Sequence, residues 1–179
     1  DMTAASAGIN ERTAKQTGID YDKVYLSPAS HASYYPGGKV MTMKVIFEKK
    51  TYKLLGAQII GYDGVDKRID VLATAMYAGI TALQLKELDL SSAKDPVNMA
   101  GFMIENIAEG RLKQFFTEDV ANLPRDGSVI LLDARTPGEY ARGHIEGFIN
   151  IPVDELRDRI SELDKKKKVY IICQSGLRS

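Results

Sequence analysis

A change of pattern near Lys113 limits the folds that this chain can adopt. Before it, two partly alternating apolar runs, 42–48 and 54–61, flank a short polar segment, which predicts an antiparallel pair of strands. Apolar residues at helical spacing follow over 66–78, and a second helix is predicted to begin at Asp95–Pro96, since Asp is a good N-cap and Pro suits the first turn. Strands followed by helices predict an α+β domain.

After Lys113 the pattern changes to strands that alternate with short helices. The predicted strands cover 129–132, 148–151 and 169–172, and the predicted helices cover 137–141 and 154–163. This alternation is typical of an α/β domain with a parallel sheet, in which ligands bind beyond the carboxyl ends of the strands. The sequence therefore predicts two domains, an α+β domain over 1–112 and an α/β domain over 113–179.

Composition argues against several classes of partner. The 179 residues include 24 basic and 24 acidic side chains. The net charge is therefore zero and does not favour binding to nucleic acid or to a membrane surface. No apolar stretch approaches the roughly 20 residues that a membrane-spanning helix needs. A single cysteine, Cys173, cannot form an internal disulfide, and with two histidines it argues against a four-ligand zinc site. We expect no metal, no nucleic acid and a reducing, cytoplasmic setting.

Cys173 lies where the predicted strand 169–172 meets the loop CQSGLRS. A tight loop at this point can turn several main-chain N–H groups inward, because Gly176 supplies a permissive backbone, and Arg178 adds positive charge. Such a field lowers the pKa of a thiol and favours the thiolate, which attacks sulfur. The loop therefore suits a nucleophile that carries something anionic, either a persulfide sulfur or a phosphoryl group.

The length of the loop separates these two chemistries. Four residues lie between Cys173 and Arg178, one fewer than in cysteine phosphatases. The smaller cradle favours sulfur over a tetrahedral phosphate. Cysteine phosphatase or arsenate reductase activity is therefore the less favoured alternative.

The segment DARTPGEYARGHIEGFINIP, followed one strand later by CQSGLRS, resembles a rhodanese domain, a sulfurtransferase module that holds sulfane sulfur as a cysteine persulfide. The resemblance implies that Cys173 is the carrier. The cradle would be the backbone of Gln174, Ser175, Gly176, Leu177, Arg178 and Ser179, and the framework residues would be Asp133, Arg135 and His144. Because Gln174 and Leu177 carry no charge, we expect a donor less charged than thiosulfate, such as a small-molecule persulfide.

The first domain resembles the dimerisation domain of flavin-dependent pyridine nucleotide-disulfide oxidoreductases. The segments that carry this resemblance are AGIN, HASYYPGG, LLGAQIIGYDGVDKRIDVLATA and SSAKDPVNMAGF. Among these enzymes the coenzyme A-disulfide reductases are the most similar branch. A fusion of this domain to a rhodanese domain is similar to the NADH-dependent persulfide or polysulfide reductases of bacteria.

This resemblance implies the C-terminal portion of an FAD- and NAD(P)H-dependent reductase of CoA disulfides, persulfides or polysulfides. No G-x-G-x-x-G follows a predicted strand, so domains outside this chain would hold the flavin and the nicotinamide. A homodimer through residues 1–112 is implied, with Tyr34 or Tyr35 reaching the partner's active site; Tyr34 is the preferred candidate. A phenol there can donate a hydrogen bond to a leaving thiolate.

Two departures from the family pattern modify these expectations. The family usually has a longer aromatic and proline-rich stretch between the positions of Leu90 and Ser92, whereas here Ser91 alone separates them. In addition, the sequence ends before the last helix and strand of a rhodanese domain. We expect that the sequence records parts of a longer polypeptide, with a true deletion as the alternative. The alternative function is a dimerisation and sulfur-binding module without turnover of its own.

Overall fold

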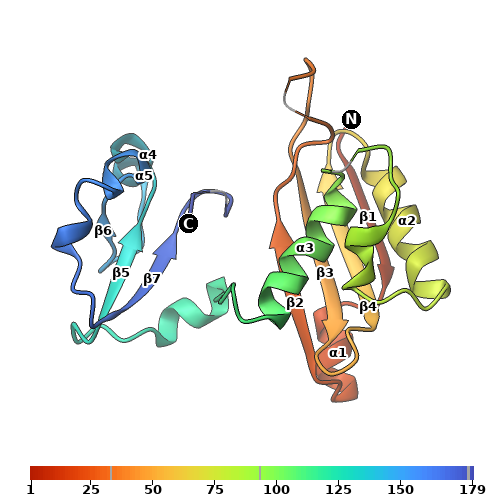
Figure 1. The fold of residues 1–179 in the computed structure, drawn as a ribbon, viewed down its shortest axis with the longest axis horizontal. Helices are drawn as coiled ribbons and strands as arrows, with labels where there is room; N and C mark the ends of the chain where they lie inside the picture. Colours follow the sequence, from red (N-terminus) through yellow and green to blue (C-terminus); the bar gives the residue numbers. More distant parts are fainter. Residues whose placement is uncertain (33, 93, 177) are drawn as a thin grey trace. The chain divides into compact units, whose positions relative to one another are not determined.

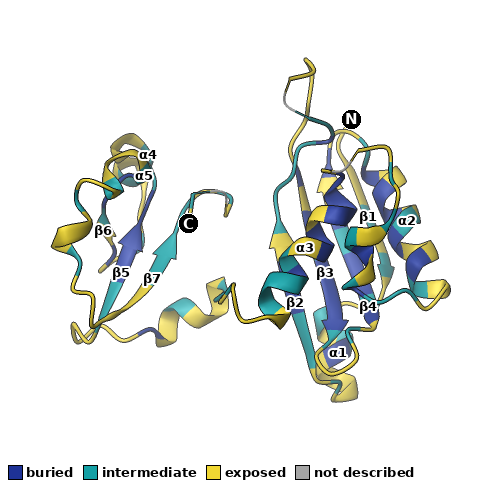
Figure 2. Cartoon of the chain, viewed as in Figure 1, coloured by how far each residue is buried: buried dark blue, intermediate teal, exposed yellow. Residues whose placement is uncertain are grey.

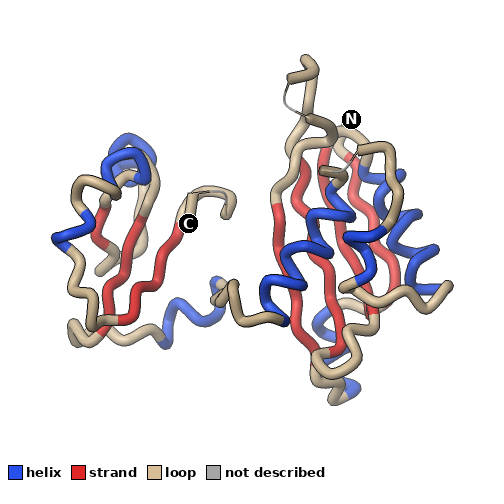
Figure 3. Tube along the Cα trace, viewed as in Figure 1, coloured by secondary structure: helices blue, strands red, loops and turns tan. Residues whose placement is uncertain are grey.

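The chain forms two compact units, Asp1–Lys113 and Gln114–Ser179, with a boundary one residue from the expected one. The structure is a computed structural model that describes residues 1–32, 34–92, 94–176 and 178–179. The first unit contains a four-stranded antiparallel sheet and the second a three-stranded parallel sheet (Figures 1 and 3). The prediction of an α+β unit followed by an α/β unit is confirmed.

The sheet of the first unit has the strand order β1-β4-β3-β2. Its strands are β1 (Thr3–Gly8), β2 (Tyr21–Leu26), β3 (Met41–Glu48) and β4 (Leu54–Gly61). Its helices are α1 (Glu11–Thr17), α2 (Val65–Tyr77), the short 3-10 helix η1 (Gln84–Glu87) and α3 (Pro96–Ala108). Helices α2 and α3 cover one face of the sheet (Figure 1).

The core of the first unit lies between the sheet and these two helices. Leu72 of α2, Ile104 of α3 and Phe47 of β3 are almost completely buried there. Figure 2 shows dark blue, buried segments in both helices and in β3. The predicted N-terminus of α3 is confirmed: Asp95 caps the helix by accepting a hydrogen bond from the Val97 N–H at 3.1 Å. The strand pair β3–β4 and helix α2 are also confirmed.

The sheet of the second unit has the order β6-β5-β7, and both strand pairs are parallel, as predicted. The strands are β5 (Val129–Asp133), β6 (Ile149–Asn150) and β7 (Lys168–Ile172). The helices are η2 (Thr117–Asn122), α4 (Pro137–Arg142), α5 (Val153–Leu156) and η3 (Ile160–Glu162). The central strand β5 brings the ends of β6 and β7 to one edge, where Asp133 and Cys173 lie.

The prediction of one continuous helix over 154–163 is wrong. The segment forms α5 and η3, two separate turns. Ile160, an apolar residue of this segment, is 58% exposed. Most helical stability in proteins comes from burial of an apolar face, so this segment has little to hold it in one helix.

None of the helices formed by the described residues is long and apolar enough to cross a lipid bilayer.

Candidate functional site

Cys173 is placed directly after β7, and the loop that follows folds back around its sulfur. The Sγ atom accepts hydrogen bonds from the main-chain N–H groups of Gly176 at 3.1 Å and Arg178 at 3.4 Å. The hydroxyl of Ser179 lies 3.4 Å from the same sulfur. Gly176 has φ +84°, a left-handed conformation that glycine adopts without strain and that lets the loop curl. The loop thus turns main-chain N–H groups inward as the sequence predicted, and its binding of an anion stays a prediction.

The loop favours the ionised form of the thiol. Partial burial of Cys173 opposes ionisation, but hydrogen bonds from the Ser179 hydroxyl and from the N–H groups of Arg178, Ser175 and Gly176 outweigh it and lower the pKa to about 7. Near neutral pH a substantial fraction of the sulfur is therefore thiolate, the nucleophilic form. The lowered pKa expected from the sequence is confirmed.

The Arg178 side chain is held by a partner that the sequence analysis did not identify. Its Nη1 and Nη2 atoms donate to the two carboxylate oxygens of Glu139 at 2.7 and 2.8 Å. Glu139 also accepts a hydrogen bond from the Thr136 N–H at 2.8 Å and thereby closes the capping box of α4. The Arg178 guanidinium lowers the pKa of Glu139 far below its usual value. The positive charge expected beside Cys173 is thus paired with a carboxylate.

The sequence contains a local signal for the role of Glu139 in capping α4, but none for its pairing with Arg178. The sequence Thr-Pro-Gly-Glu at 136–139 has the spacing of a capping box at a helix start, which needs only local sequence. The pairing with Arg178 joins residues 39 positions apart and depends on the parallel sheet.

The expected framework residues support the edge of the sheet. Asp133 is completely buried, and its carboxylate accepts hydrogen bonds from Arg135, at 2.7 Å from Nη2. The Asn150 side chain ties β6 to this turn by donating to the main-chain oxygens of Asp133 and Arg135. His144 stacks on the Tyr140 ring, with ring centroids 3.9 Å apart, and its Nδ1 lies 3.2 Å from the main-chain oxygen of Tyr140. These contacts are structural ones.

Residues of the cysteine loop line two different pockets. Cys173, Gly176 and Ser179 line a pocket of about 330 Å³ together with apolar side chains such as Phe115 and Ile145. Gln174 lines a different, polar pocket of about 350 Å³, whose other members are Arg135, Glu139, Arg142 and Gly143. The structure therefore separates Gln174 from the sulfur's pocket. Leu177, which the sequence assigns to the cradle, lies outside the described residues.

The tyrosines expected to act belong to the first unit. Tyr34 and Tyr35 are 82% and 62% exposed, with ring centroids 4.9 Å apart. They line a pocket of about 350 Å³ whose wall includes a buried ion pair, Arg68–Asp95, at 3.0 Å. Arg68 also donates to the main-chain oxygen of Ser30 at 2.7 Å, which anchors the start of the segment that carries the tyrosines.

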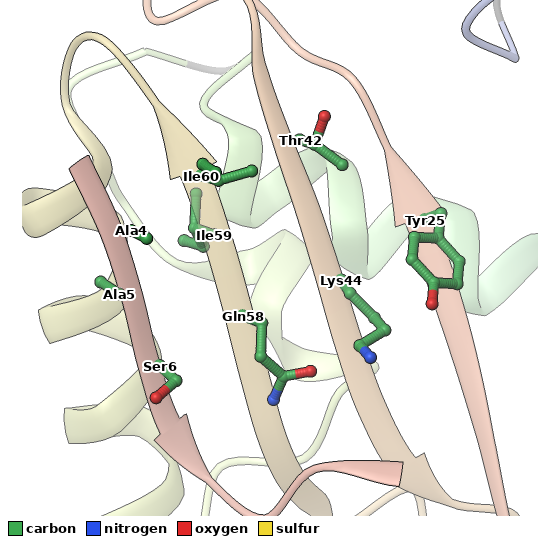
Figure 4. Close-up of a pocket in the computed structure, with 9 residues that line it drawn as sticks. All are labelled: Ala4, Ala5, Ser6, Tyr25, Thr42, Lys44, Gln58, Ile59 and Ile60. Atoms are coloured by element: carbon green, nitrogen blue, oxygen red, sulfur yellow. The ribbon is translucent and has the colours of Figure 1, made fainter. Parts of the chain in front are cut away.

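The sheet face opposite α2 and α3 is open over part of its area. Figure 4 shows Tyr25, Lys44 and Gln58, from three neighbouring strands, on this face, with the helices behind the sheet. The hollow has a volume of about 440 Å³. At its edge Glu11 of α1 accepts from Lys23 at 2.7 Å and from Lys44 at 3.2 Å. The sequence analysis did not identify this face.

The described residues offer no cradle for FAD or NAD(P)H. These cofactors need a glycine-rich turn between a parallel strand and a helix. The turns after β5 and β6, at 134–136 and 151–152, contain no glycine, and the loop after β7 contains Gly176 alone. The described part of the chain therefore does not fit either cofactor.

Comparison with known proteins agrees with the division of the chain into two units. Residues 1–89 match the pyridine nucleotide-disulphide oxidoreductase dimerisation domain, and residues 116–179 match the rhodanese-like domain. A coenzyme A disulfide reductase of Staphylococcus epidermidis is 40% identical over 108 residues, which are 57% of this chain and 24% of that protein.

Two solved structures match both units. The reduced CoADR-RHD of Bacillus anthracis has 44% sequence identity and a TM-score of 0.91, over 99% of this chain and 33% of that one. A NAD-dependent persulfide reductase from A. fulgidus has 38% identity and a TM-score of 0.85, over 100% and 33%. The chain thus spans between about a quarter and a third of the length of these relatives. It consists of a domain of the pyridine nucleotide-disulphide oxidoreductase dimerisation family followed by a domain of the rhodanese-like family.

Proposed function

We propose that Cys173 carries sulfane sulfur as a persulfide. The thiolate attacks the outer sulfur of a persulfide donor R–S–SH; a new S–S bond forms on Cys173, the donor's S–S bond breaks, and the donor leaves as the thiolate R–S⁻. The observation that carries the proposal is the environment of the sulfur. The sulfur accepts hydrogen bonds from the main-chain N–H groups of Gly176 and Arg178, and the pKa of the Cys173 thiol is lowered to about 7. The same donors can stabilise the negative charge of the persulfide that forms.

We further propose that the chain is the C-terminal portion of a CoA-disulfide or persulfide reductase that uses FAD and NAD(P)H. The named relatives support this assignment, since a coenzyme A disulfide reductase and a persulfide reductase match it at 38–40% identity. The family of the first unit is one of dimerisation domains. We infer a homodimer through residues 1–112, in which Tyr34 or Tyr35 donates a hydrogen bond to the departing thiolate in the partner's active site.

The carrier role is tested by intact mass spectrometry of the polypeptide before and after exposure to glutathione persulfide. The wild type should gain the mass of one sulfur atom, and Cys173→Ser should gain none, since it retains the fold but not the nucleophile. Addition of a thiol such as dithiothreitol should remove the sulfur again. A gain that the thiol cannot reverse would favour a sulfur-binding module without turnover, and no gain in the wild type would contradict the carrier role.

A further inference from the structure

The charges around the cysteine loop are paired on the protein itself. Arg178, the basic residue of the loop, makes two hydrogen bonds to Glu139, at 2.7 and 2.8 Å. Arg135, which faces Glu139, is bound to the buried carboxylate of Asp133 at 2.7 Å. These two arginines and two carboxylates sum to no net charge. A donor that reaches Cys173 therefore meets N–H dipoles and two arginines that are each paired with a carboxylate, while Arg142, which lines the polar pocket with Glu139, lies outside this group.

Glu139 is also fixed in place from its own helix. Its carboxylate accepts from the N–H and the hydroxyl of Thr136 at 2.8 and 2.9 Å, while its N–H donates to the Thr136 hydroxyl at 3.3 Å. The side chain is 20% exposed, so solvent screens the pair only in part. A carboxylate held by a capping box at one end and by a guanidinium at the other has little freedom to move when a donor arrives.

We propose that Glu139 is a positioning residue that determines which sulfur donors Cys173 accepts. By holding the Arg178 guanidinium it cancels the charge that a dianion such as thiosulfate would need, and it leaves the loop suited to organic persulfides of low charge. This inference rests on the carrier role proposed for Cys173. Both donors deliver the same sulfur: thiosulfate yields the Cys173 persulfide and sulfite, and an organic persulfide yields the same persulfide and a thiolate.

The substitution Glu139→Gln separates charge from structure. Glutamine also completes a capping box, so the start of α4 is retained while the ion pair is lost. The released positive charge of Arg178 should attract a dianion, and the ratio of kcat/KM for thiosulfate to that for glutathione persulfide should rise about tenfold. The change should depend on Arg178, so the double variant Glu139→Gln/Arg178→Gln should lose the gain.

The matched control is Glu162→Gln. Glu162 is bound to Arg159 by two hydrogen bonds at 2.7 and 2.9 Å, so the control removes the same kind of ion pair elsewhere on the second unit. Its donor ratio should stay at the wild-type value. An unchanged ratio in Glu139→Gln, with sulfur transfer intact, would overturn the inference and leave the carrier role standing. Failure of the wild type to take sulfur from either donor would instead contradict the carrier role.

A measurement on the wild type covers the case in which Glu139→Gln does not fold. If Glu139 neutralises Arg178, raising the salt concentration should leave the thiosulfate rate unchanged or raise it, because there is no attraction to screen and the Cys173 thiolate repels the dianion. A steep fall of the thiosulfate rate with salt would show an uncompensated cation at the loop and would overturn the inference.

Discussion

Several hydrogen-bond donors stabilise the Cys173 thiolate. Among them the Ser179 hydroxyl belongs to a side chain, so a substitution can remove it without changing the main chain. The wild-type rate of alkylation by iodoacetamide should follow a titration with a pKa of about 7 and fall as the pH drops below it. Ser179→Ala should raise this pKa by about one unit or more, because a hydrogen bond to a charged acceptor contributes about 1.5 kcal/mol or more.

Ser175→Ala is the control for this substitution. Ser175 donates to the sulfur through its main-chain N–H, which alanine retains. The alkylation profile of this variant should therefore match the wild type. A shift of equal size in both variants would mean that the hydroxyl of Ser179 has no specific role.

The residues of this site differ in how far the sequence could predict them. Cys173 and Gly176 follow from a short apolar strand that ends in a glycine-bearing turn, which is local information, although the strand itself is only half-buried. The place of Gln174 in a different pocket depends on which way the loop curls, and the pairing of Glu139 with Arg178 depends on tertiary structure. Local sequence therefore predicts the nucleophile but not the charges that surround it.

Glu11 of the first unit forms ion pairs with two lysines, Lys23 and Lys44. Burial opposes its ionisation, but hydrogen bonds and charge from Lys23 and Lys44 lower its pKa from 4.5 to about 2. A lowered pKa stabilises the folded state above the unfolded value, so the stabilisation is complete above about pH 4.5 and is lost as the pH falls toward 2. The side chain is 17% exposed, so this contribution is only partly screened.

Glu11→Gln should therefore lower the free energy of unfolding at pH 7 by about 2–3 kcal/mol. The difference from the wild type should narrow as the pH approaches 2, because the wild-type carboxylate is then protonated as well. Urea unfolding at several pH values measures this. A difference that stays constant over the whole range would mean that packing, and not charge, accounts for the effect.

At the scale of elements, the contact between α3 and η1 depends on one glycine. A Cβ on Gly101 would lie 2.4 Å from the Lys86 nitrogen and 3.0 Å from the Leu85 carbonyl carbon, both of which are main-chain atoms. Helix propensity alone would make alanine about 1 kcal/mol more favourable than glycine. We expect the steric effect to outweigh it, so Gly101→Ala should destabilise the protein by roughly 1–3 kcal/mol.

The control for the glycine is Gly138 of α4, where an added Cβ meets nothing within 4 Å. Gly138→Ala should leave the midpoint of chemical unfolding unchanged or raise it slightly. If Gly101→Ala were also neutral, the separation between α3 and η1 would have to adjust more freely than two buried elements normally do.

The elements that the sequence predicted are those with a strong local pattern. β3 and β4 have apolar runs around a polar turn, and α3 has a capping residue and a proline at its start. The edge strands β1 and β2 were not predicted. β1 reads Thr-Ala-Ala-Ser-Ala-Gly, which is not a typical strand composition, and β2 has strand-favouring Tyr and Val residues interrupted by Asp22 and Lys23. Pairing with β4 and β3 completes both strands.

At the scale of the whole molecule, the residues that the structure describes form two hydrophobic cores that share no residue. The core of the first unit includes Leu72, which is completely buried in α2. The core of the second unit is smaller and is built around Leu123, Leu131 and Phe148. Because each unit has its own sheet and its own core, each can unfold cooperatively by itself.

Calorimetry of the intact chain should therefore show two unfolding transitions. Leu72→Ala and Leu131→Ala each remove a buried side chain, which costs about 2–5 kcal/mol, and for units of this size that lowers the melting temperature by about 10 °C or more. Each variant should move one transition and leave the other in place, because distant substitutions without shared partners act independently. If either variant moved both transitions together, the two units would unfold as one block, and the loop of Cys173 would share its stability with the first unit.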